Sequence, residues 1–393
     1  ARYANTHFQE GGLIMSMVFN EDQLMLQDSV RAFCQENASV AELRRVRDEK
    51  ETDGFSRKLW QQMVDLGWAG MTIPEAYGGF GFGYTGLEIV LEETGRTLVP
   101  TPLVSTVLLC ATALNLGGNE TQKMTLLPKI AVGELVMALA HEETPLHQPM
   151  RIATTASADA EGYILNGTKT FVLDGHVADK LIVVARTAGQ QDDKDGISLF
   201  LVAREALGVD VQRLDLVDSR NAARISFTDV HVSADALLGE KDHGYTLLEK
   251  TLDVGRIGLA AEMLGSAQEV FDRTIDYLKQ REQFGVLIGA FQGLQHRAAH
   301  MYSELELCRS AVRRAFSELD GAQEEIPVLA SIAKAKLSEV FELISNEGVQ
   351  MHGGIGMTDE FDIGFYLKRA RVVQALLGDA NFHRDRYASL NGF

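Results

Sequence analysis

The stretch Gly162–Leu173, GYILNGTKTFVL, alternates apolar and polar side chains and predicts β-structure in the middle of the chain. Its Asn166-Gly167 pair is a strong local signal for a hairpin turn, so we expect the chain to reverse there. Three more runs of strand character follow, at residues 181–187, 197–203 and 223–232. Helical signals are absent from this part of the sequence, and we predict a compact β domain over residues 134–240.

Helical patterns precede the β domain. Asn20 opens a capping-box pattern ahead of an apolar stripe with helical spacing. Ser56 stands before a second such run, and we expect Thr85 and Glu88 to cap a third helix. Residues 17–133 are therefore predicted to form an all-α N-terminal domain.

Helical patterns also follow the β domain. After Gly244, apolar residues recur every three or four positions along two long segments, a spacing typical of antiparallel helix packing. Pro327 is expected in the first turn of a third helix, and Phe361 at the start of a fourth. We therefore predict that residues 241–393 form a four-helix bundle.

The composition excludes several classes of protein. With 393 residues, of which 46% are hydrophobic and 23% charged, the chain has the make-up of an ordinary globular protein. Its net charge of −18 argues against nucleic acid as a partner, because phosphate binding needs clustered Lys and Arg. No run of about 18 apolar residues occurs, so we expect no membrane span.

The cysteines and the first residues bear on location. Cys34, Cys110 and Cys308 stand far apart without metal-ligand spacing, so we expect reduced, buried thiols and no metal site. Together with the acidic charge, these thiols favour the cytoplasm. Residues 1–16 lack the pattern of a signal peptide and are interpreted as a tail or a cloning remnant.

Six blocks of sequence carry a family resemblance. They are IPEAYGGFG with LEETGR, then LPKIAVGE, GYILNGTK, ISFTDVHV with SADALLGE, REQFGVLIGAFQGLQH and QMHGGIGMT. In this order and spacing, the chain resembles the acyl-CoA dehydrogenases over residues 18–390. Within that family it looks most like the small subunit of two-component bacterial enzymes of the pimeloyl-CoA dehydrogenase type.

The resemblance implies an α+β multidomain fold: an all-α N-terminal domain, a middle β-barrel and a C-terminal four-helix bundle. It implies an oxidoreductase of fatty acid metabolism and β-oxidation that performs FAD-dependent α,β-dehydrogenation of an acyl-CoA thioester. FAD is then expected between the middle and C-terminal domains, with its adenine end reaching a neighbouring subunit. The implied partners are acyl-CoA, a second copy of the chain or a second dehydrogenase subunit, and an electron-transfer flavoprotein.

The resemblance also implies particular cofactor-binding residues. Arg281, Gln283 and Phe284 match an R-x-x-F-G element in which the guanidinium meets the FAD pyrophosphate. Arginine suits this role because its planar fork of donors matches phosphate oxygens and stays charged. The remaining expected contacts are Gln292, Gln350, Gly353 and Gly354, the glycines giving a partner's FAD close access to the backbone.

The middle domain departs from the family pattern. The segment 141–151, HEETPLHQPMR, replaces the usual Thr-Glu-Pro and Gly-Ser-Asp run, and the usual Trp-Ile-Thr becomes Phe171-Val172-Leu173. Leu173 has no hydroxyl to offer the flavin. A flavin ring bound to this subunit's own middle domain is therefore expected to lack polar contacts.

The catalytic carboxylate is replaced at both of its usual positions. In the family a glutamate at the position of Leu377, or in some relatives at that of Gly255, removes the proton α to the thioester carbonyl. We take Asp379 and Arg256 as the candidate catalytic residues. Asp379 could swing in as the base, although the sequence favours it more as a helix cap.

Three functions stay open at this point. The chain is a working acyl-CoA dehydrogenase with Asp379 or a partner's carboxylate as base, or a non-catalytic subunit that supports FAD in a catalytic partner. The third hypothesis is a flavin oxidase or monooxygenase on the same fold, which needs no such base. The distribution of motifs supports the second hypothesis, because the adenine-side residues are kept while the ring-side and base residues are changed.

Overall fold

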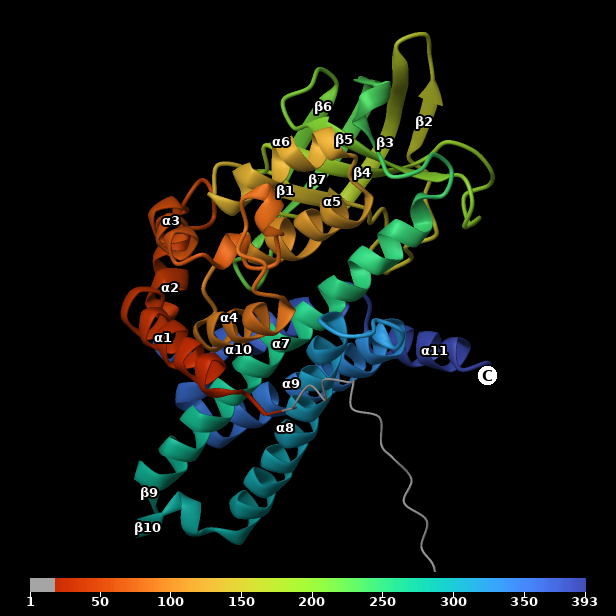
Figure 1. Cartoon of the computed structure of the whole chain (residues 1–393). Helices are drawn as coiled ribbons and strands as arrows, with labels where there is room; N and C mark the ends of the chain where they lie inside the picture. The colour runs from red at the N-terminus through yellow and green to blue at the C-terminus, as the bar shows by residue number, and fades with distance from the viewer. Residues whose placement is uncertain (1–17) are drawn as a thin grey trace, which may run out of the picture.

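The computed structural model describes residues 18–393, and the predicted tail, residues 1–16, lies outside them (Figure 1). The chain begins with helices: α1 (Glu21–Asn37), α2 (Val40–Asp48), α3 (Arg57–Asp65), α4 (Tyr84–Thr97), α5 (Ala111–Gly117) and α6 (Glu120–Ala131). A π-helical segment, η3 (Leu103–Cys110), leads into α5, and short 3-10 turns follow α3. The predicted capping box at Asn20 and the Ser56 cap are both confirmed.

The predicted cap of the third helix is wrong. α4 begins at Tyr84, and its first N–H groups are satisfied by Asp320, a residue distant in sequence. The Asp320 carboxylate accepts from the N–H groups of Tyr84 at 2.7 Å and Thr85 at 2.8 Å. Glu88 instead lies buried inside the protein. The helix start is thus fixed by tertiary contact and not by its own sequence.

The middle domain is an eight-stranded sheet. Its strands are β1 (Met137–Ala140), β2 (Thr155–Ala158), β3 (Gly162–Leu173), β4 (Lys180–Arg186), β5 (Ile197–Ala203), β6 (Val209–Asp215), β7 (Asn221–Ser233) and β8 (Leu237–Leu238). They pair in the order β6-β7-β3-β2-β4-β5-β8, with β1 added alongside β4. The sheet has its own hydrophobic core, and the expected β domain is confirmed.

The predicted hairpin at Asn166-Gly167 is wrong, because β3 runs straight through it. The pairing of β3 with β7 shifts register between Leu165 and Gly167, which marks a β-bulge. Gly167 has φ 152°, and an added Cβ would lie 2.4 Å from Thr154 Oγ1. The glycine is therefore needed for a close approach inside the sheet. The chain reverses earlier, where Asp159 accepts from the N–H groups of Glu161 and Gly162.

The C-terminal helices are α7 (Gly244–Gln280), α8 (Gln292–Leu319), α9 (Ile326–His352), α10 (Ile363–Ala375) and α11 (Ala380–Leu390). Pro327 lies in the first turn of α9, as predicted. A small hairpin of β9 (Glu282–Gln283) and β10 (Val286–Leu287) joins α7 to α8. Figure 1 shows this hairpin at the end of the molecule opposite the sheet.

The two helical regions share one core, and α7 is central to it. One cluster of buried side chains includes Leu91 of α4, Leu264 of α7 and Phe341 of α9. α7 packs against both α4 and α9. The three cysteines are buried and unpaired, which confirms that part of the prediction. In residues 18–393, none of the helices combines the length and the hydropathy that a bilayer crossing requires.

Candidate functional site

The first group of predicted nucleotide-binding residues lies at an exposed end of the molecule. α7 ends at Gln280, and Arg281 leads into the β9–β10 hairpin. The Phe284 side chain is 92% exposed, and its backbone has φ 56°. Arg281 and Gln283 are exposed as well. These side chains are accessible to a group that comes from outside the chain.

The second group lies at the same end. Gln292 is the first residue of α8 and Gln350 is in the last turn of α9, and both are exposed. His352 of α9 packs on Tyr277 of α7 with 4.4 Å between the ring centroids. This contact brings the turn at Gly353-Gly354 beside the C-terminal end of α7. The sequence thus identified residues that the fold brings together, and we call this region the nucleotide end (Arg281–Phe284, Gln292, Gln350 and Gly353-Gly354).

The two glycines of the nucleotide end are open to solvent. A Cβ added to Gly353 or Gly354 would meet no atom within 4 Å. By contrast, a Cβ on Gly265 would lie 1.8 Å from the carbonyl oxygen of Glu92. Packing within the chain therefore does not require Gly354 to be glycine, although Gly353 has φ 66°. Bare backbone at an exposed turn suits a phosphate-bearing group, so this end fits the adenine side of FAD.

The two positions at which the family resemblance leads us to expect a base face each other in the interior. Gly255 lies in α7, and Leu377 lies between α10 and α11. A Cβ added to Gly255 would lie 3.0 Å from Leu377 Cδ1 and 2.5 Å from Leu109 Cδ2. Leu377 itself is only 1% exposed. Both positions therefore border one apolar spot, and neither offers a group that takes a proton.

Hydrogen bonds to backbone carbonyls hold the loop that contains Leu377. His383 Nε2 donates to the Leu377 carbonyl at 3.0 Å, and Arg256 Nε reaches the same oxygen at 3.4 Å. Lys334 Nζ donates to the Gly378 carbonyl at 2.8 Å. Leu377 has φ 58°, a left-handed conformation that a residue other than glycine keeps only when its neighbours hold it, and Gly378 follows with φ 102°. We call residues 376–379 the clamped loop.

Burial lowers the pKa of two groups of this clamp, Lys334 and His383. Burial, with repulsion from Arg256, lowers the pKa of Lys334 to about 7. Burial, with repulsion from Arg256 and Lys334, lowers the pKa of His383 to about 2. His383 is therefore neutral at ordinary pH, and its Nε2 carries the proton that it donates to Leu377.

The first candidate catalytic residue, Asp379, is the N-cap of α11. Its Oδ1 accepts from the N–H of Phe382 at 2.8 Å, so the predicted cap is confirmed. The carboxylate is therefore engaged with the start of a helix. A role as base stays a prediction.

The second candidate, Arg256, is fully buried in α7. Its Nη1 donates to Asp253 at 2.8 Å, and its Nη2 lies 3.3 Å from Glu249 and 2.9 Å from His147 Nε2. Because a guanidinium only donates, His147 Nε2 must accept, and its proton must sit on Nδ1. Arg256 thus orients its neighbours through several hydrogen bonds.

His147 donates its Nδ1 proton to the carboxylate of Glu142. Burial lowers the pKa of His147 to about 4, against the opposing effect of Glu142. Burial alone would raise the pKa of Glu142, but His141 and His147 hold it below its ordinary value. These three side chains place potential ligand atoms within 4.8 Å of one another. The guanidinium of Arg256 against His147 opposes a cation there, so we assign His147 and Glu142 to hydrogen bonding.

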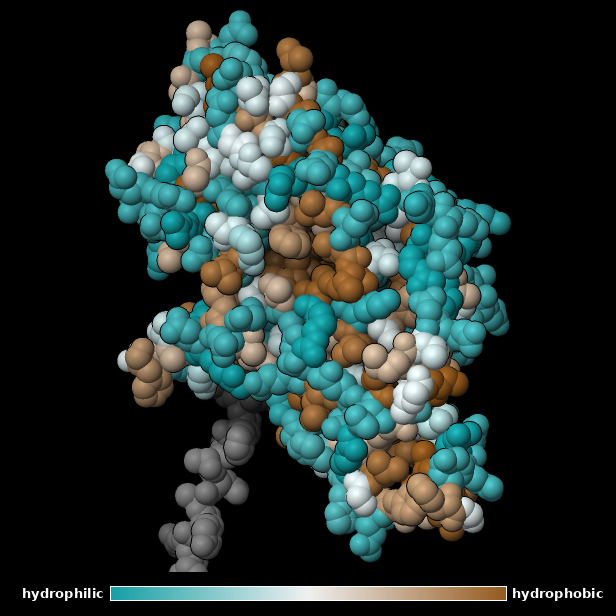
Figure 2. All heavy atoms as spheres, turned by 180° about the vertical axis from the view of Figure 1, so that it is seen from behind, coloured by the Kyte–Doolittle hydropathy of each residue, from teal (hydrophilic) through white to brown (hydrophobic). Residues whose placement is uncertain are grey.

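Beside the clamped loop lies an apolar cavity of about 70 Å³. Figure 2 shows a hydrophobic hollow between the β domain above and the helices below. The lining is Glu142, Thr144, Pro145, His147, Phe171, Leu173, Leu216, Val372, Ala375, Leu376 and Leu377. Its polar side chains are already engaged: His147 and Glu142 bond each other, and the Thr144 hydroxyl donates to a backbone carbonyl. These side chains do not fit the polar edge of a flavin ring.

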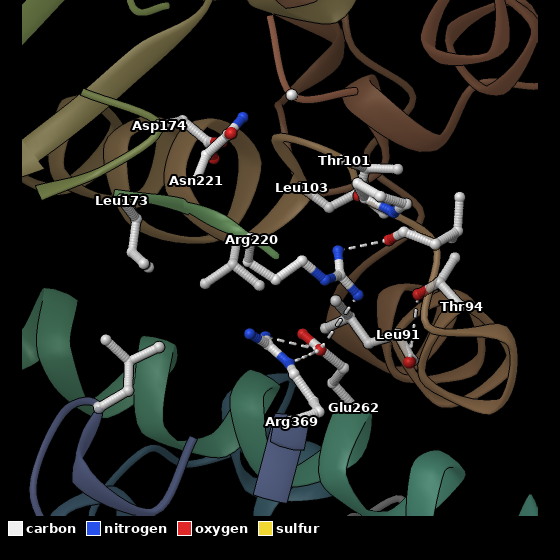
Figure 3. Close-up of a pocket in the computed structure, with 15 residues that line it drawn as sticks. Leu91, Thr94, Thr101, Leu103, Leu173, Asp174, Arg220, Asn221, Glu262 and Arg369 are labelled. Atoms are coloured by element: carbon white, nitrogen blue, oxygen red, sulfur yellow. Dashed lines mark hydrogen bonds and ion pairs between the residues drawn. The ribbon is translucent and has the colours of Figure 1, made fainter. Parts of the chain in front are cut away.

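A second, inner cavity of about 40 Å³ lies behind Leu173 and Leu376, which line both cavities. Figure 3 shows Arg220 and Arg369 converging there on Glu262. Arg369 Nη2 donates to Glu262 at 2.7 Å, and Arg220 Nη1 donates to a carbonyl of the α4–η3 connection. These charges largely compensate one another and tie the β domain to the helices.

The sequence did not identify three residues of this region: His147, Lys334 and His383. His147 and Lys334 bond to distant parts of the chain, at Arg256 and Gly378. His383 bonds to Leu377, six residues earlier, across the start of α11. The available signal was weak. It consisted of a lysine on the apolar side of a helix pattern and histidines next to motif positions.

The comparison with family models covers nearly the whole described chain. The model described as "Acyl-CoA dehydrogenase, N-terminal domain" matches residues 20–134. The middle-domain model matches residues 137–230, and the C-terminal-domain model matches residues 242–389. The three matches follow one another in the same order as the helical, β and helical regions.

Individual relatives agree with the family models. The chain is 30% identical over 375 residues to a mitochondrial short/branched chain specific acyl-CoA dehydrogenase of Bos taurus, covering 94% of this chain and 85% of that protein. It matches butyryl-CoA dehydrogenase of Megasphaera elsdenii with a TM-score of 0.87 and 27% identity, covering 96% and 100% of the two chains. It matches a steroid ACAD variant designated Tcur3481-Tcur3483 with a TM-score of 0.85 and 31% identity, covering 94% and 98%. The chain therefore belongs to the acyl-CoA dehydrogenase family of FAD-dependent flavoproteins.

Proposed function

We propose that this chain is one subunit of a two-component acyl-CoA dehydrogenase of the pimeloyl-CoA dehydrogenase type. In this proposal it supports FAD at the nucleotide end while a partner subunit removes the α-proton of the acyl-CoA thioester. The proposal refines the shared family activity, the FAD-dependent dehydrogenation of acyl-CoA.

One observation carries the proposal: Gly255 and Leu377 face the same apolar spot. The α-proton of a thioester is weakly acidic, so its removal needs a positioned base. Bound FAD would accept the hydride from the β-carbon. Leucine and glycine cannot take the proton, and this supports a division of labour between two subunits.

The neighbouring titratable groups are poor substitutes for that base. His147 has a pKa of about 4, chiefly because it is buried, and the histidines beside Glu142 hold its pKa low. A base whose conjugate acid is this strong gives little driving force for removing a weakly acidic proton. Asp379 is engaged in capping α11. The groups nearest to Leu377 thus favour a structural role for this region.

The nucleotide end supports the other half of the proposal. Arg281 would bind the FAD pyrophosphate, with Gln283, Phe284, Gln292 and Gln350 around it and the Gly353-Gly354 backbone open to a phosphate. All of these residues are exposed, as a contact to a neighbouring subunit requires. The paired designation Tcur3481-Tcur3483 of one similar structure also suits a two-chain enzyme. We further propose an electron-transfer flavoprotein as electron acceptor and the cytoplasm as location.

Restoring the carboxylate tests the proposal without a partner. Native chain, Leu377→Glu and the matched Leu377→Gln are each expressed alone, supplied with FAD, and mixed with acyl-CoA and an artificial electron acceptor. We expect substoichiometric flavin in all three and no turnover, because the chain alone does not hold a flavin ring, even where Leu377→Glu supplies a carboxylate. Turnover that appears in Leu377→Glu and not in Leu377→Gln would show a competent ring site on this chain and reject the proposal. Circular dichroism verifies that the buried substitutions leave the fold intact. If they unfold the chain, the flavin content of the native chain tests the proposal instead, and one FAD bound per chain in the absence of a partner would reject it.

A further inference from the structure

His147 lies between two cavities of different character. An outer cavity of about 700 Å³ is lined by residues 147–151, Asp192, Lys194, Tyr245, Glu249, Phe382, Asp385, Arg386, Ser389 and Leu390. The apolar cavity beside Leu377 has about one tenth of that volume, 70 Å³. Among the described residues, His147 is the lining residue that these two cavities share. The two cavities therefore adjoin one another at this residue.

The imidazole is fixed in place from three sides. Arg256 Nη2 donates to its Nε2 at 2.9 Å, and its Nδ1–H donates to Glu142. Its ring meets Phe382 edge-on with 4.7 Å between the centroids. The side chain is 3% exposed. Because both ring nitrogens are satisfied by buried partners, turning the ring aside would break one hydrogen bond of Arg256 and one of Glu142.

The two cavities suit the two ends of a thioester. The outer cavity carries as many acidic as basic side chains, the basic ones being Arg151, Lys194 and Arg386. Arg151 and Arg386 are paired with carboxylates of the same lining, whereas Lys194 Nζ lies 5.9 Å from the ring centroid of Tyr245. Such a mixed polar lining suits the amides and a phosphate of a CoA arm. The apolar cavity is lined mainly by aliphatic side chains and suits a hydrocarbon chain. His147 stands where the polar part of such a ligand would end and the hydrocarbon part would begin.

We propose that His147 is a specificity-determining gate that keeps the acyl chain of a CoA thioester out of the apolar cavity. The choice of a CoA thioester as ligand rests on the proposed function, to which it adds that this chain also binds acyl-CoA, whereas the gate itself rests on the two cavities and the hydrogen bonds. With the gate closed, the acyl chain stays in the open outer cavity. Its length then contributes little to binding.

Calorimetric titration with CoA, butanoyl-CoA and octanoyl-CoA tests the gate. For the native chain we expect the three dissociation constants to agree within about twofold, because the acyl chain stays near water. For His147→Ala we expect octanoyl-CoA to bind at least tenfold more tightly than CoA, since each methylene taken out of water contributes about fourfold. His147→Asn, which keeps a polar side chain but removes the ring, should give a smaller difference of the same sign.

Gln148→Ala is the matched control, because Gln148 lines only the outer cavity. In this control, as in the native chain, the dissociation constants for CoA, butanoyl-CoA and octanoyl-CoA should agree within about twofold. A steep dependence on acyl length in the native chain would reject the gate, and so would a flat response in both His147 variants. Failure of the native chain to bind any of the three ligands would also reject it. These outcomes are separate from the turnover assay with Leu377→Glu, so the two proposals fail independently.

Discussion

The nucleotide end and the clamped loop differ in what their residues contact. At the nucleotide end, Phe284 is 92% exposed and Gly354 has open space around it. In the clamped loop, Leu377 is 1% exposed and its carbonyl is held by His383 and Arg256. The residues of the nucleotide end contribute little to packing within the chain, so we expect them to contact groups from outside it. The residues of the clamped loop are needed by the fold itself, and substituting them should affect stability first.

Lys334→Met should have the largest effect on stability. It removes the donor to the carbonyls of Gln374 and Gly378, and a buried carbonyl left without a partner costs about 1–3 kcal/mol. We expect a loss of roughly 3 kcal/mol in the free energy of unfolding, measured by urea denaturation. Lys336→Met, on the same helix, removes a partly exposed ion pair with Glu304 and should cost less than about 1 kcal/mol. Equal losses in the two variants would contradict the clamp.

The pH dependence of stability should reveal His383. Burial lowers its folded pKa to about 2, below the ordinary value of 6.5, so the unfolded chain binds more protons as the pH falls. Stability from this group is therefore complete above pH 6.5 and is lost progressively on acidification towards pH 2. Between pH 6.5 and 5 the native chain should lose roughly 2 kcal/mol more than His383→Asn. Parallel curves from urea denaturation at several pH values would show that His383 does not titrate in this way.

These two predictions concern residues that the sequence did not identify, whereas the secondary structure was largely predictable. Local caps such as Asn20 and Pro327 act within a single turn, so the sequence near them was sufficient. The bulge at Gly167 was mistaken for a hairpin because the same dipeptide serves both backbone shapes. The cap of α4 could not be found at all, since Asp320 comes from a distant helix end.

The residues of the candidate site also fall into those that the sequence identified and those that only the structure reveals. The residues of the nucleotide end were identified by motif, and the fold places them together at one exposed end. The family resemblance singled out Leu377 and Gly255, yet only the structure shows that they face one spot. His147 was missed because its hydrogen bond to Arg256 of α7 depends on packing between two domains.

Arg281→Ala should separate binding from stability. The side chain is exposed, so the free energy of unfolding should change by less than about 0.5 kcal/mol. In the two-subunit complex, the dissociation constant for FAD should rise roughly tenfold or more, since a charge-assisted hydrogen bond to phosphate is lost. Fluorescence of released FAD measures this constant. Arg57→Ala removes an exposed arginine of the N-terminal domain and should leave FAD binding unchanged. If both variants release FAD equally, Arg281 does not contact the cofactor.

Gly354→Ala should give the smallest effect and the sharpest contrast with the interior. A methyl group there meets no atom of this chain within 4 Å, so the isolated chain should keep its stability or gain up to about 1 kcal/mol through a less flexible unfolded state. If the bare backbone serves a phosphate from a neighbouring subunit, the same methyl should weaken FAD binding by the complex a fewfold. Gly265→Ala is the interior counterpart, because its added Cβ would lie 1.8 Å from a carbonyl oxygen of α4 and should destabilise the chain alone. Thermal melting of the isolated variants and FAD titration of the complexes measure the two quantities separately. A Gly354→Ala chain that is stable and binds FAD normally would remove the glycine turn from the nucleotide end and leave Arg281 as its main cofactor contact.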